Sequence, residues 1–384
     1  MNHNKEQDRI EAEKNLESFE IPASMNAAET AEEKKKKLRS RIIWIAIFVV
    51  VNVAVISYTA VTEFSNQPPE ELSFTFGFTN TLFLIAGIAC MLLALALESF
   101  KYVVMMRNLG VKVSGKAAFQ TAALGKYYDN ITPSGIGGQP FQIYNMHSMG
   151  YSNGVSAAMP LTSFLTMQIG FIILALAVVI FKPDAIGDLI GVRVIAYIGI
   201  VCYAAVPFAI ILFTISRKTA TKLITGIINL GAKLRIVKDP EKTAGGILKS
   251  VSEYNDSIIM MSRKKWLLVK LLVMSVIYQL AISSIPFFVL LAYNGSADYI
   301  DTVAMTVYIY CAITVIPTPG NAGAAEGSFY LVFSQLDPTG LFWAMLIWRV
   351  ICYYAFIAIG IGIYAYNAVV RRRAEKKNPL KKQE

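Results

Sequence analysis

The segment Asp129-Asn-Ile-Thr-Pro-Ser-Gly-Ile-Gly-Gly-Gln-Pro140 interrupts an otherwise apolar part of the chain. A second break, Pro317-Thr-Pro-Gly-Asn-Ala-Gly-Ala-Ala-Glu-Gly-Ser328, also has apolar or aromatic sequence on both sides. Irregular backbone is tolerated at membrane depth only where protein or a wet cavity satisfies its N–H and C=O groups. We therefore predict that 116–150 and 302–336 form two re-entrant hairpins whose broken centres face a polar cavity.

The composition places these breaks in a membrane protein. Of 384 residues, 55% are hydrophobic and 16% are charged, whereas an ordinary soluble domain has about 45–50% and about 25%. This excludes a soluble globular enzyme of normal build. Four cysteines without CxxC spacing and two histidines exclude a disulfide scaffold and a histidine-based metal cluster. We predict an all-α polytopic helical bundle in the membrane, with no cofactor and no metal site.

Membrane helices need about 20 mostly apolar residues. Six stretches qualify, at about 42–61, 79–99, 155–181, 190–216, 266–292 and 341–369. The segment 62–78 is acidic and should lie outside, whereas basic residues gather after the second span, in 217–265 and after the last span. The positive-inside rule then predicts a multi-pass protein of the cell membrane with both termini in the cytoplasm.

The order of spans and hairpins predicts the domain organisation. Residues 1–41 form a disordered cytoplasmic tail, 42–370 the membrane domain and 371–384 a basic cytoplasmic tail. Within the membrane domain, span, span, hairpin and span occur twice with opposite orientation, giving halves of about 42–181 and 190–369. The second half contains a cytoplasmic amphipathic linker at 217–265. Inverted repeats with broken segments in corresponding positions are typical of transporters, which bind substrate at the repeat interface.

Charges inside apolar sequence need a reason, because a central Arg, Lys or Asp costs about 2.5–3.5 kcal/mol on insertion scales. On a structural interpretation Glu326 pairs with Arg349, and Glu98 pairs with Lys101 one turn on. On a functional interpretation Arg349 and Lys126 contact a phosphate in a headgroup cavity, and Glu326 faces a cationic headgroup or carries a coupling proton. For Glu98 and Lys101 we expect the salt bridge.

The breaks also offer uncharged groups that suit an anion or a headgroup. Glycines allow close backbone approach and expose N–H groups that can form an anion-binding concavity. We expect this of Gly135, Gly137 and Gly138 in the first hairpin, and of Gly320 and Gly323 in the second. The side chains of Asn130, Ser134 and Gln139 add polar groups beside the first set.

Leu124-Gly-Lys-Tyr-Tyr-Asp-Asn-Ile-Thr-Pro-Ser-Gly-Ile-Gly-Gly-Gln-Pro140 resembles the signature of the lysylphosphatidylglycerol synthase membrane region, a flippase-like family. Ile316-Pro-Thr-Pro-Gly-Asn-Ala-Gly-Ala-Ala-Glu326 resembles its second Pro/Gly-Glu motif, with Asn321 where a glycine is common. Arg349 with Tyr353 and Tyr354 resembles its last-span arginine and aromatics. The resemblance covers about 42–370.

The resemblance implies a role in lipid transport. In two-part members a cytoplasmic domain transfers lysine from lysyl-tRNA to phosphatidylglycerol, and the membrane region is thought to flip the product, which gives resistance to cationic antimicrobial peptides. Because the sequence ends soon after the last span, we expect only the membrane half of that activity. The expected partners are a membrane phospholipid and a separate lipid-modifying enzyme.

Our leading hypothesis is a stand-alone translocase for an aminoacylated or other phosphate-bearing lipid. One alternative is a phosphatidylglycerol lysyltransferase, or a subunit of one, which would require lysyl-tRNA; another is an ion-coupled solute transporter. The predicted headgroup-binding residues are Lys126, Asn130, Ser134, Gly135, Gly137, Gly138, Gln139, Pro317, Gly320, Gly323, Glu326, Arg349 and Tyr353.

Overall fold

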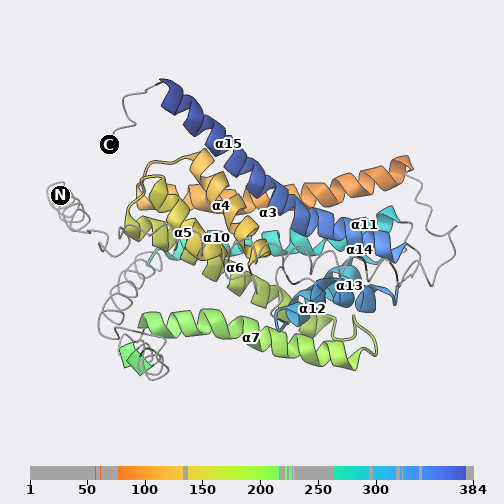
Figure 1. Ribbon diagram of the computed structural model, residues 1–384. Coiled ribbons are helices and arrows are strands. Elements are labelled where there is room, and N and C mark those ends of the chain that lie inside the picture. Colours follow the sequence, from red (N-terminus) through yellow and green to blue (C-terminus); the bar gives the residue numbers. More distant parts are fainter. Residues whose placement is uncertain are drawn as a thin grey trace.

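The computed structural model describes residues 77–132, 137–215, 263–293, 297–316, 323–336 and 340–377, with isolated positions at 57, 61, 221–222, 225–226, 228 and 321. Every regular element in these ranges is a helix (Figure 1). Nearly all of the predicted span at 42–61 and of the linker at 217–265 lies outside the described residues. The tail at 1–41 and the end of the basic tail at 378–384 lie outside them entirely.

The helices follow the apolar stretches of the sequence. In chain order they are α3 (Phe78–Leu109), α4 (Gly115–Ile131), α5 (Gly138–Ser148), α6 (Asn153–Phe181), α7 (Ile190–Ile215), α10 (Lys265–Ser283), α11 (Ile285–Ala292), α12 (Tyr299–Ile313), α13 (Ala324–Phe333), α14 (Leu341–Arg349), the π-helical turn η2 (Val350–Tyr354) and α15 (Ala355–Lys377).

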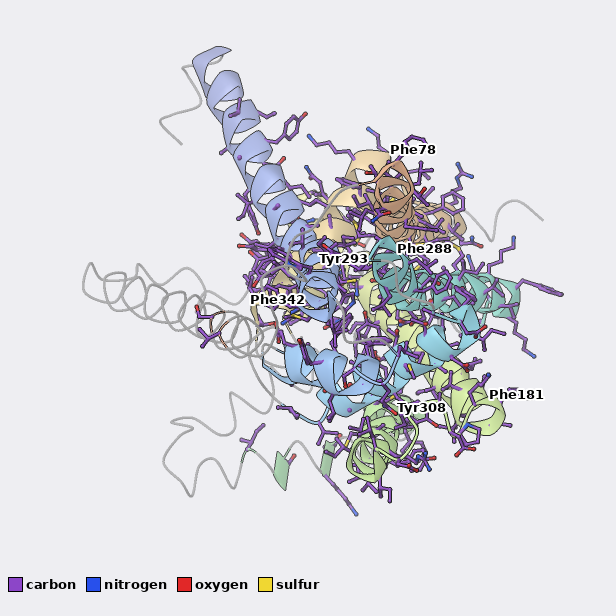
Figure 2. The ribbon with its side chains drawn as sticks, turned by 90° about the vertical axis from the view of Figure 1, so that its right-hand side faces the viewer. Phe78, Phe181, Phe288, Tyr293, Tyr308 and Phe342 are labelled. Carbon is purple, nitrogen blue, oxygen red and sulfur yellow. The ribbon has the colours of Figure 1, made fainter. Side chains whose placement is uncertain are left out.

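In the part of the chain that the structure describes, four helical stretches are long and apolar enough to cross a bilayer: Phe78–Leu109, Gly154–Phe181, Lys265–Ala292 and Leu341–Val370. Large apolar side chains point away from the bundle, including Phe78 on α3 and Phe181 on α6, both labelled in Figure 2. Tyr308 and Phe342, in contrast, are buried between helices. This apolar exterior confirms the predicted all-α integral membrane protein.

The span predicted at 79–99 is too short, because α3 continues to Leu109. Glu98 and Lys101 therefore lie within the helix rather than at its end. The Lys101 ammonium lies 3.0 Å from a Glu98 carboxylate oxygen and donates to Ser163 O and Ser275 Oγ, while Ser163 Oγ donates to Glu98. The expected salt bridge is confirmed, and because its polar atoms are satisfied by α6 and α10, the charges do not end the helix.

Two of the predicted spans contain a break. At 266–292, α10 ends at Ser283 and α11 begins at Ile285, with Pro286 in its first turn. Proline has no N–H to continue the hydrogen-bond ladder, so the helix is interrupted there. At 341–369, the π-helical turn η2 separates α14 from α15, and the final helix extends to Lys377.

Each Pro/Gly-rich segment connects two helices that pack against each other, α4 with α5 and α12 with α13. In the first pair, Gln142 Nε2 donates to Thr121 O at 3.1 Å and Asn145 Nδ2 donates to Thr121 Oγ1 at 3.3 Å. Two side-chain bonds from α5 therefore join the two helices of the first hairpin at Thr121. The depth of both hairpins in a bilayer remains a prediction.

Among the described residues, the order of α3, α4–α5 and α6 resembles that of α10–α11, α12–α13 and α14–α15. The inverted repeat itself stays a prediction. The two halves nevertheless interlock, because α10 packs on α3 and α6, and α15 packs on α4 (Figure 1). Helix α7 lies along α12 so closely that a methyl group on Gly199 would overlap the carbonyl oxygen of Cys311.

Candidate functional site

The last span and the second hairpin meet in a buried ion pair. Arg349 ends α14 and is 6% exposed, and Glu326 in the first turn of α13 is 2% exposed. Arg349 Nε donates to Glu326 Oε1 at 2.6 Å. The structural interpretation of these two charges is thus confirmed, and the cost of burying them is offset only because they pair.

Glu326 also holds the start of its own helix. Helix α13 follows Gly323, whose φ of 83° suits a glycine, and the Gly323 N–H donates to Glu326 Oε2 at 2.7 Å. A carboxylate is favoured at a helix N-terminus, where backbone N–H groups have no helical partner. One oxygen of Glu326 therefore binds the helix start and the other binds the guanidinium, which fixes the carboxylate in place.

On the other side of the pair, Arg349 contacts Tyr353 in η2. The guanidinium carbon lies 4.5 Å from the centre of the Tyr353 ring, which is within the range of a cation–π interaction. The Tyr353 hydroxyl donates to Asn130 O at 3.0 Å, and Asn130 Nδ2 donates to Tyr353 O at 3.2 Å. Single π-turns inside α-helices are frequent at functional sites, and this one joins the last span to the end of α4.

These contacts form one connected chain of polar groups. We call it the central polar chain, defined by Gly323, Glu326, Arg349, Tyr353 and Asn130. It runs from the residue before α13 to the last turn of α4, so it joins the flanks of both Pro/Gly-rich breaks. All five residues belong to the predicted set, although they come from three separate parts of the sequence.

Lys126 lies one turn before Asn130 on α4. Its ammonium is 3.8 Å from Asp129 Oδ2 and 5.2 Å from the centre of the Tyr278 ring on α10. The side chains of Lys126 and Asp129 are 27% and 22% exposed, whereas Arg349 and Glu326 are buried. Sequence reasoning missed Tyr278; the signal was the adjacent polar pair Tyr278 and Gln279 within the apolar stretch 266–292.

The glycines after the first break do not expose their N–H groups as expected. The Gly137 N–H donates to Thr132 Oγ1 and the Gly138 N–H donates to Asp129 Oδ1, each at 3.0 Å. The hairpin thus closes on its own side chains, and these two donors are already bound within the protein. A methyl group on Gly138 would overlap Asp129, so glycine permits the close approach.

The other residues predicted to bind a headgroup add little to the description of the site. Gln139 lies at the start of α5 and is partly buried. The predicted residues Ser134, Gly135, Pro317 and Gly320 lie outside the described residues. Within the described ranges, no three His, Cys, Asp or Glu side chains gather in a way that could hold a metal ion.

The fold and this polar centre define a polytopic helical membrane protein whose interior charges join two broken hairpins. Residues 43–360 match the lysylphosphatidylglycerol synthase TM region, and the chain belongs to that family. It is also similar to a UPF0104 membrane protein of Archaeoglobus fulgidus, with 22% identity over 296 residues that cover 76% of this chain and 88% of the archaeal protein.

Proposed function

We propose that this protein moves a phosphate-bearing lipid, such as an aminoacylated phosphatidylglycerol, between the leaflets of the membrane. One observation carries the proposal: the buried guanidinium of Arg349 lies between the flanks of the two Pro/Gly-rich breaks. Intramembrane charge is costly and is typically retained for a substrate or ion pathway. Membership of the lysylphosphatidylglycerol synthase TM region supports a lipid as the substrate class.

The chemistry of the pair suits a lipid headgroup. A guanidinium binds phosphate through a planar fork of N–H donors, and a lipid phosphate would compete with Glu326 for Arg349. Glu326 would keep its bond to the Gly323 N–H and present its other oxygen to a cationic group on the headgroup. The pair therefore offers one charge to each end of a zwitterionic aminoacylated headgroup.

Lys126 supplies a second cation beside the central polar chain. Because its side chain is 27% exposed, a headgroup would reach it without unpacking the core. Asp129 and Tyr278 hold the ammonium in position. In this proposal the phosphate meets Lys126 first and Arg349 second, with Asn130 and Tyr353 between the two cations.

Transfer between these positions requires the two hairpins to separate. Two hydrogen bonds between Asn130 and Tyr353 join the first hairpin to the last span, whose Arg349 is paired with Glu326 of the second hairpin. Each typical protein hydrogen bond contributes about 0.5–1.5 kcal/mol net, so the link is weak enough to break during a transport cycle. Alternate opening on either side of Arg349 would then expose the headgroup site to one leaflet at a time.

The test is a leaflet-exchange assay with the purified full-length chain in proteoliposomes. Fluorescent phosphatidylglycerol in the outer leaflet is quenched chemically, and its rate of exchange is followed. Arg349→Gln should slow exchange at least tenfold, since a charge-assisted hydrogen bond contributes about 1.5–3 kcal/mol. Arg107→Gln, which changes an exposed arginine on α3, is the matched control and should exchange at the wild-type rate.

Three results would each replace the proposal. Folded Arg349→Gln protein that exchanges lipid at the wild-type rate would remove the role of the polar centre. Transfer of labelled lysine from lysyl-tRNA to phosphatidylglycerol by the purified chain would establish the transferase alternative. Uptake of a soluble solute without lipid exchange would establish the transporter alternative.

A further inference from the structure

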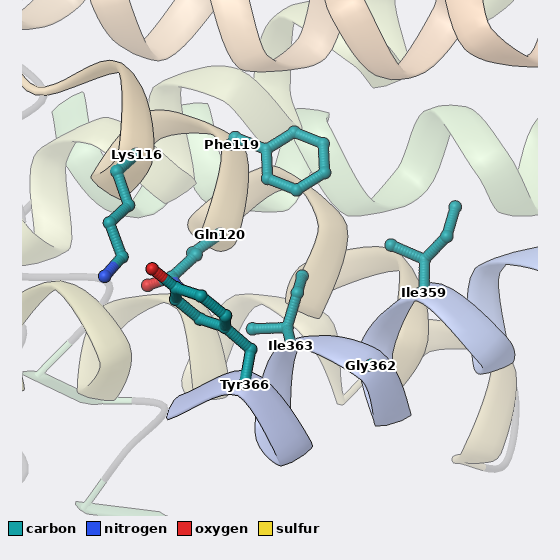
Figure 3. Close-up of a pocket in the computed structure, with 7 residues that line it drawn as sticks. All are labelled: Lys116, Phe119, Gln120, Ile359, Gly362, Ile363 and Tyr366. Atoms are coloured by element: carbon teal, nitrogen blue, oxygen red, sulfur yellow. The ribbon is translucent and has the colours of Figure 1, made fainter. Parts of the chain in front are cut away.

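A groove separate from the central polar chain runs between α4 and α15. Its volume is about 350 Å³, within the usual range for small-molecule sites. Figure 3 shows the side chains that line it, which are Phe119, Ile359, Gly362 and Ile363 along its length and Lys116, Gln120 and Tyr366 toward one end. The lining is thus apolar along most of the groove, with a cation at one end.

The groove has a fixed direction along α15. Tyr366 lies five residues before Arg371, which is about 7.5 Å along the helix, and Ile359 lies about 10 Å further from the arginines. The polar end of the groove is therefore next to Arg371, Arg372 and Arg373, and the apolar end extends toward the middle of the span. The sequence predicts that this basic end faces the cytoplasm.

Specific contacts hold the two walls apart and in register. Lys116 Nζ lies 4.9 Å from the centre of the Tyr366 ring, and Gln120 Nε2 donates to Asn367 Oδ1 at 3.0 Å. Deeper in the seam, Tyr127 packs directly against the backbone of Gly360. Between these contacts Gly362 contributes no side chain, and a methyl group placed there would meet no other atom within 4 Å. The glycine leaves the floor of the groove open.

We propose that this groove binds one anionic glycerophospholipid from the leaflet at the basic end of α15. The phosphate lies at Lys116, and one acyl chain lies along Ile359, Gly362 and Ile363. Charge complementarity favours this occupant, because the groove has a cation where a lipid phosphate would lie and apolar walls where a chain would lie. The inference extends beyond the proposed function, since lipid binding here requires no movement between leaflets.

The experiment is native mass spectrometry of the full-length chain, titrated in detergent with phosphatidylglycerol and, separately, with phosphatidylcholine. Wild type should bind the first phosphatidylglycerol more tightly than phosphatidylcholine. Lys116→Gln should weaken phosphatidylglycerol about fivefold, since a basic residue near a membrane surface contributes about 1 kcal/mol. Gly362→Leu should weaken both lipids at least tenfold by filling the groove. Thermal unfolding establishes that each variant is folded.

Two matched variants control for charge and for bulk. Lys112→Gln removes an exposed lysine four residues earlier, and Ile361→Phe enlarges an exposed side chain beside Gly362 outside the groove lining. Both should bind like wild type. The proposal is overturned if folded Gly362→Leu protein retains wild-type affinity, if Lys116→Gln leaves the lipid preference unchanged, or if Gly362→Leu alters only the fraction of dimer. Because the readout is binding, loss of leaflet exchange elsewhere would not affect this result.

Discussion

Tyr353 and Asn130 are bonded to each other twice, the tyrosine hydroxyl to the Asn130 carbonyl and the Asn130 amide to the Tyr353 carbonyl. The two residues are 223 positions apart in the sequence. Tyr353 also contacts the Arg349 guanidinium. It therefore touches both the last turn of α4 in the first hairpin and the ion pair that Arg349 forms with Glu326 of the second hairpin. We therefore expect movement of either hairpin to change the contacts of the buried charge.

Replacing both members of the buried pair should separate its structural role from its proposed role in transport. Arg349→Met alone leaves Glu326 buried without its cation and should destabilise the protein by about 3–5 kcal/mol. Adding Glu326→Gln removes the charge and keeps an oxygen for the Gly323 N–H, so most of that stability should return. Equilibrium unfolding in mixed micelles measures both changes. Leaflet exchange should stay low in the double variant, and its recovery would contradict the proposed role of Arg349.

The pair of Glu98 and Lys101 should behave differently. Lys101→Met should also destabilise by about 3–5 kcal/mol, because Glu98 would remain buried without its cation. Lys101→Met with Glu98→Gln should recover stability. We expect leaflet exchange per folded molecule to remain at the wild-type rate in the double variant. A large loss of exchange there would show that this pair belongs to the transport site.

Tyr353→Phe should loosen the link between the hairpin and the last span without removing the ring beneath Arg349. The loss of one hydrogen bond should cost about 1 kcal/mol, so amide hydrogen exchange in residues 128–132 should become about fivefold faster. Tyr144→Phe, at an exposed tyrosine on α5, is the control. Equal exchange in Tyr353→Phe and wild type would mean that the hydroxyl does not restrain α4.

Close packing between α7 and α12 gives a prediction about helix contacts. Gly199→Ala should destabilise the protein by more than 1 kcal/mol, because its methyl group would overlap the Cys311 carbonyl and force the backbones apart. Gly191→Ala in the same helix meets no atom within 4 Å and should change stability by less than about 0.5 kcal/mol. Thermal unfolding of both variants checks the difference, and similar melting temperatures would contradict the close contact.

One pH dependence follows from the ion pair outside the long apolar spans. Lys182 Nζ donates to Asp301 Oδ1 at 2.6 Å, and this hydrogen bond raises the pKa of Lys182 above its ordinary value. The pair should therefore stabilise the fold below about pH 10.4, the usual lysine pKa, and lose that contribution as the pH rises through the raised value. In Asp301→Asn, the free energy of unfolding should fall less steeply with rising pH in the alkaline range. An identical pH profile in the variant would show that the pair contributes nothing.

Among the described residues, the sequence predicts where the long apolar helices lie, because long apolar stretches and Pro/Gly breaks report local backbone preferences. It also predicts the two ion pairs, since buried charges of opposite sign need each other. The end of α3 is missed because Glu98 and Lys101 look like a boundary when their neutralising contacts with Ser163 and Ser275 are unknown. The spacing of residues in the sequence does not show which side chains of other helices the fold places beside a buried charge.

Contacts between distant parts of the chain also explain what the sequence did not predict in the candidate site. The glycine N–H groups at 137 and 138 look exposed in the sequence, but Thr132 and Asp129 reach back over the break to bind them. The bond between Asn130 and Tyr353 depends on how α4 meets the last span, which no local pattern encodes. Tyr278 approaches Lys126 only because α10 crosses between halves of the chain.

The π-turn at Val350–Tyr354 determines which way each part of the last span faces. Such a turn accommodates one extra residue compared with a regular helix, and each residue in an α-helix rotates the chain by about 100°. If the same residues formed a regular helix instead, everything beyond the turn would rotate by about 100°, which would swing Ile359, Ile363 and Tyr366 away from α4. The extra residue thus lets the last span bind the buried carboxylate of Glu326 just before the turn and pack against the first hairpin beyond it.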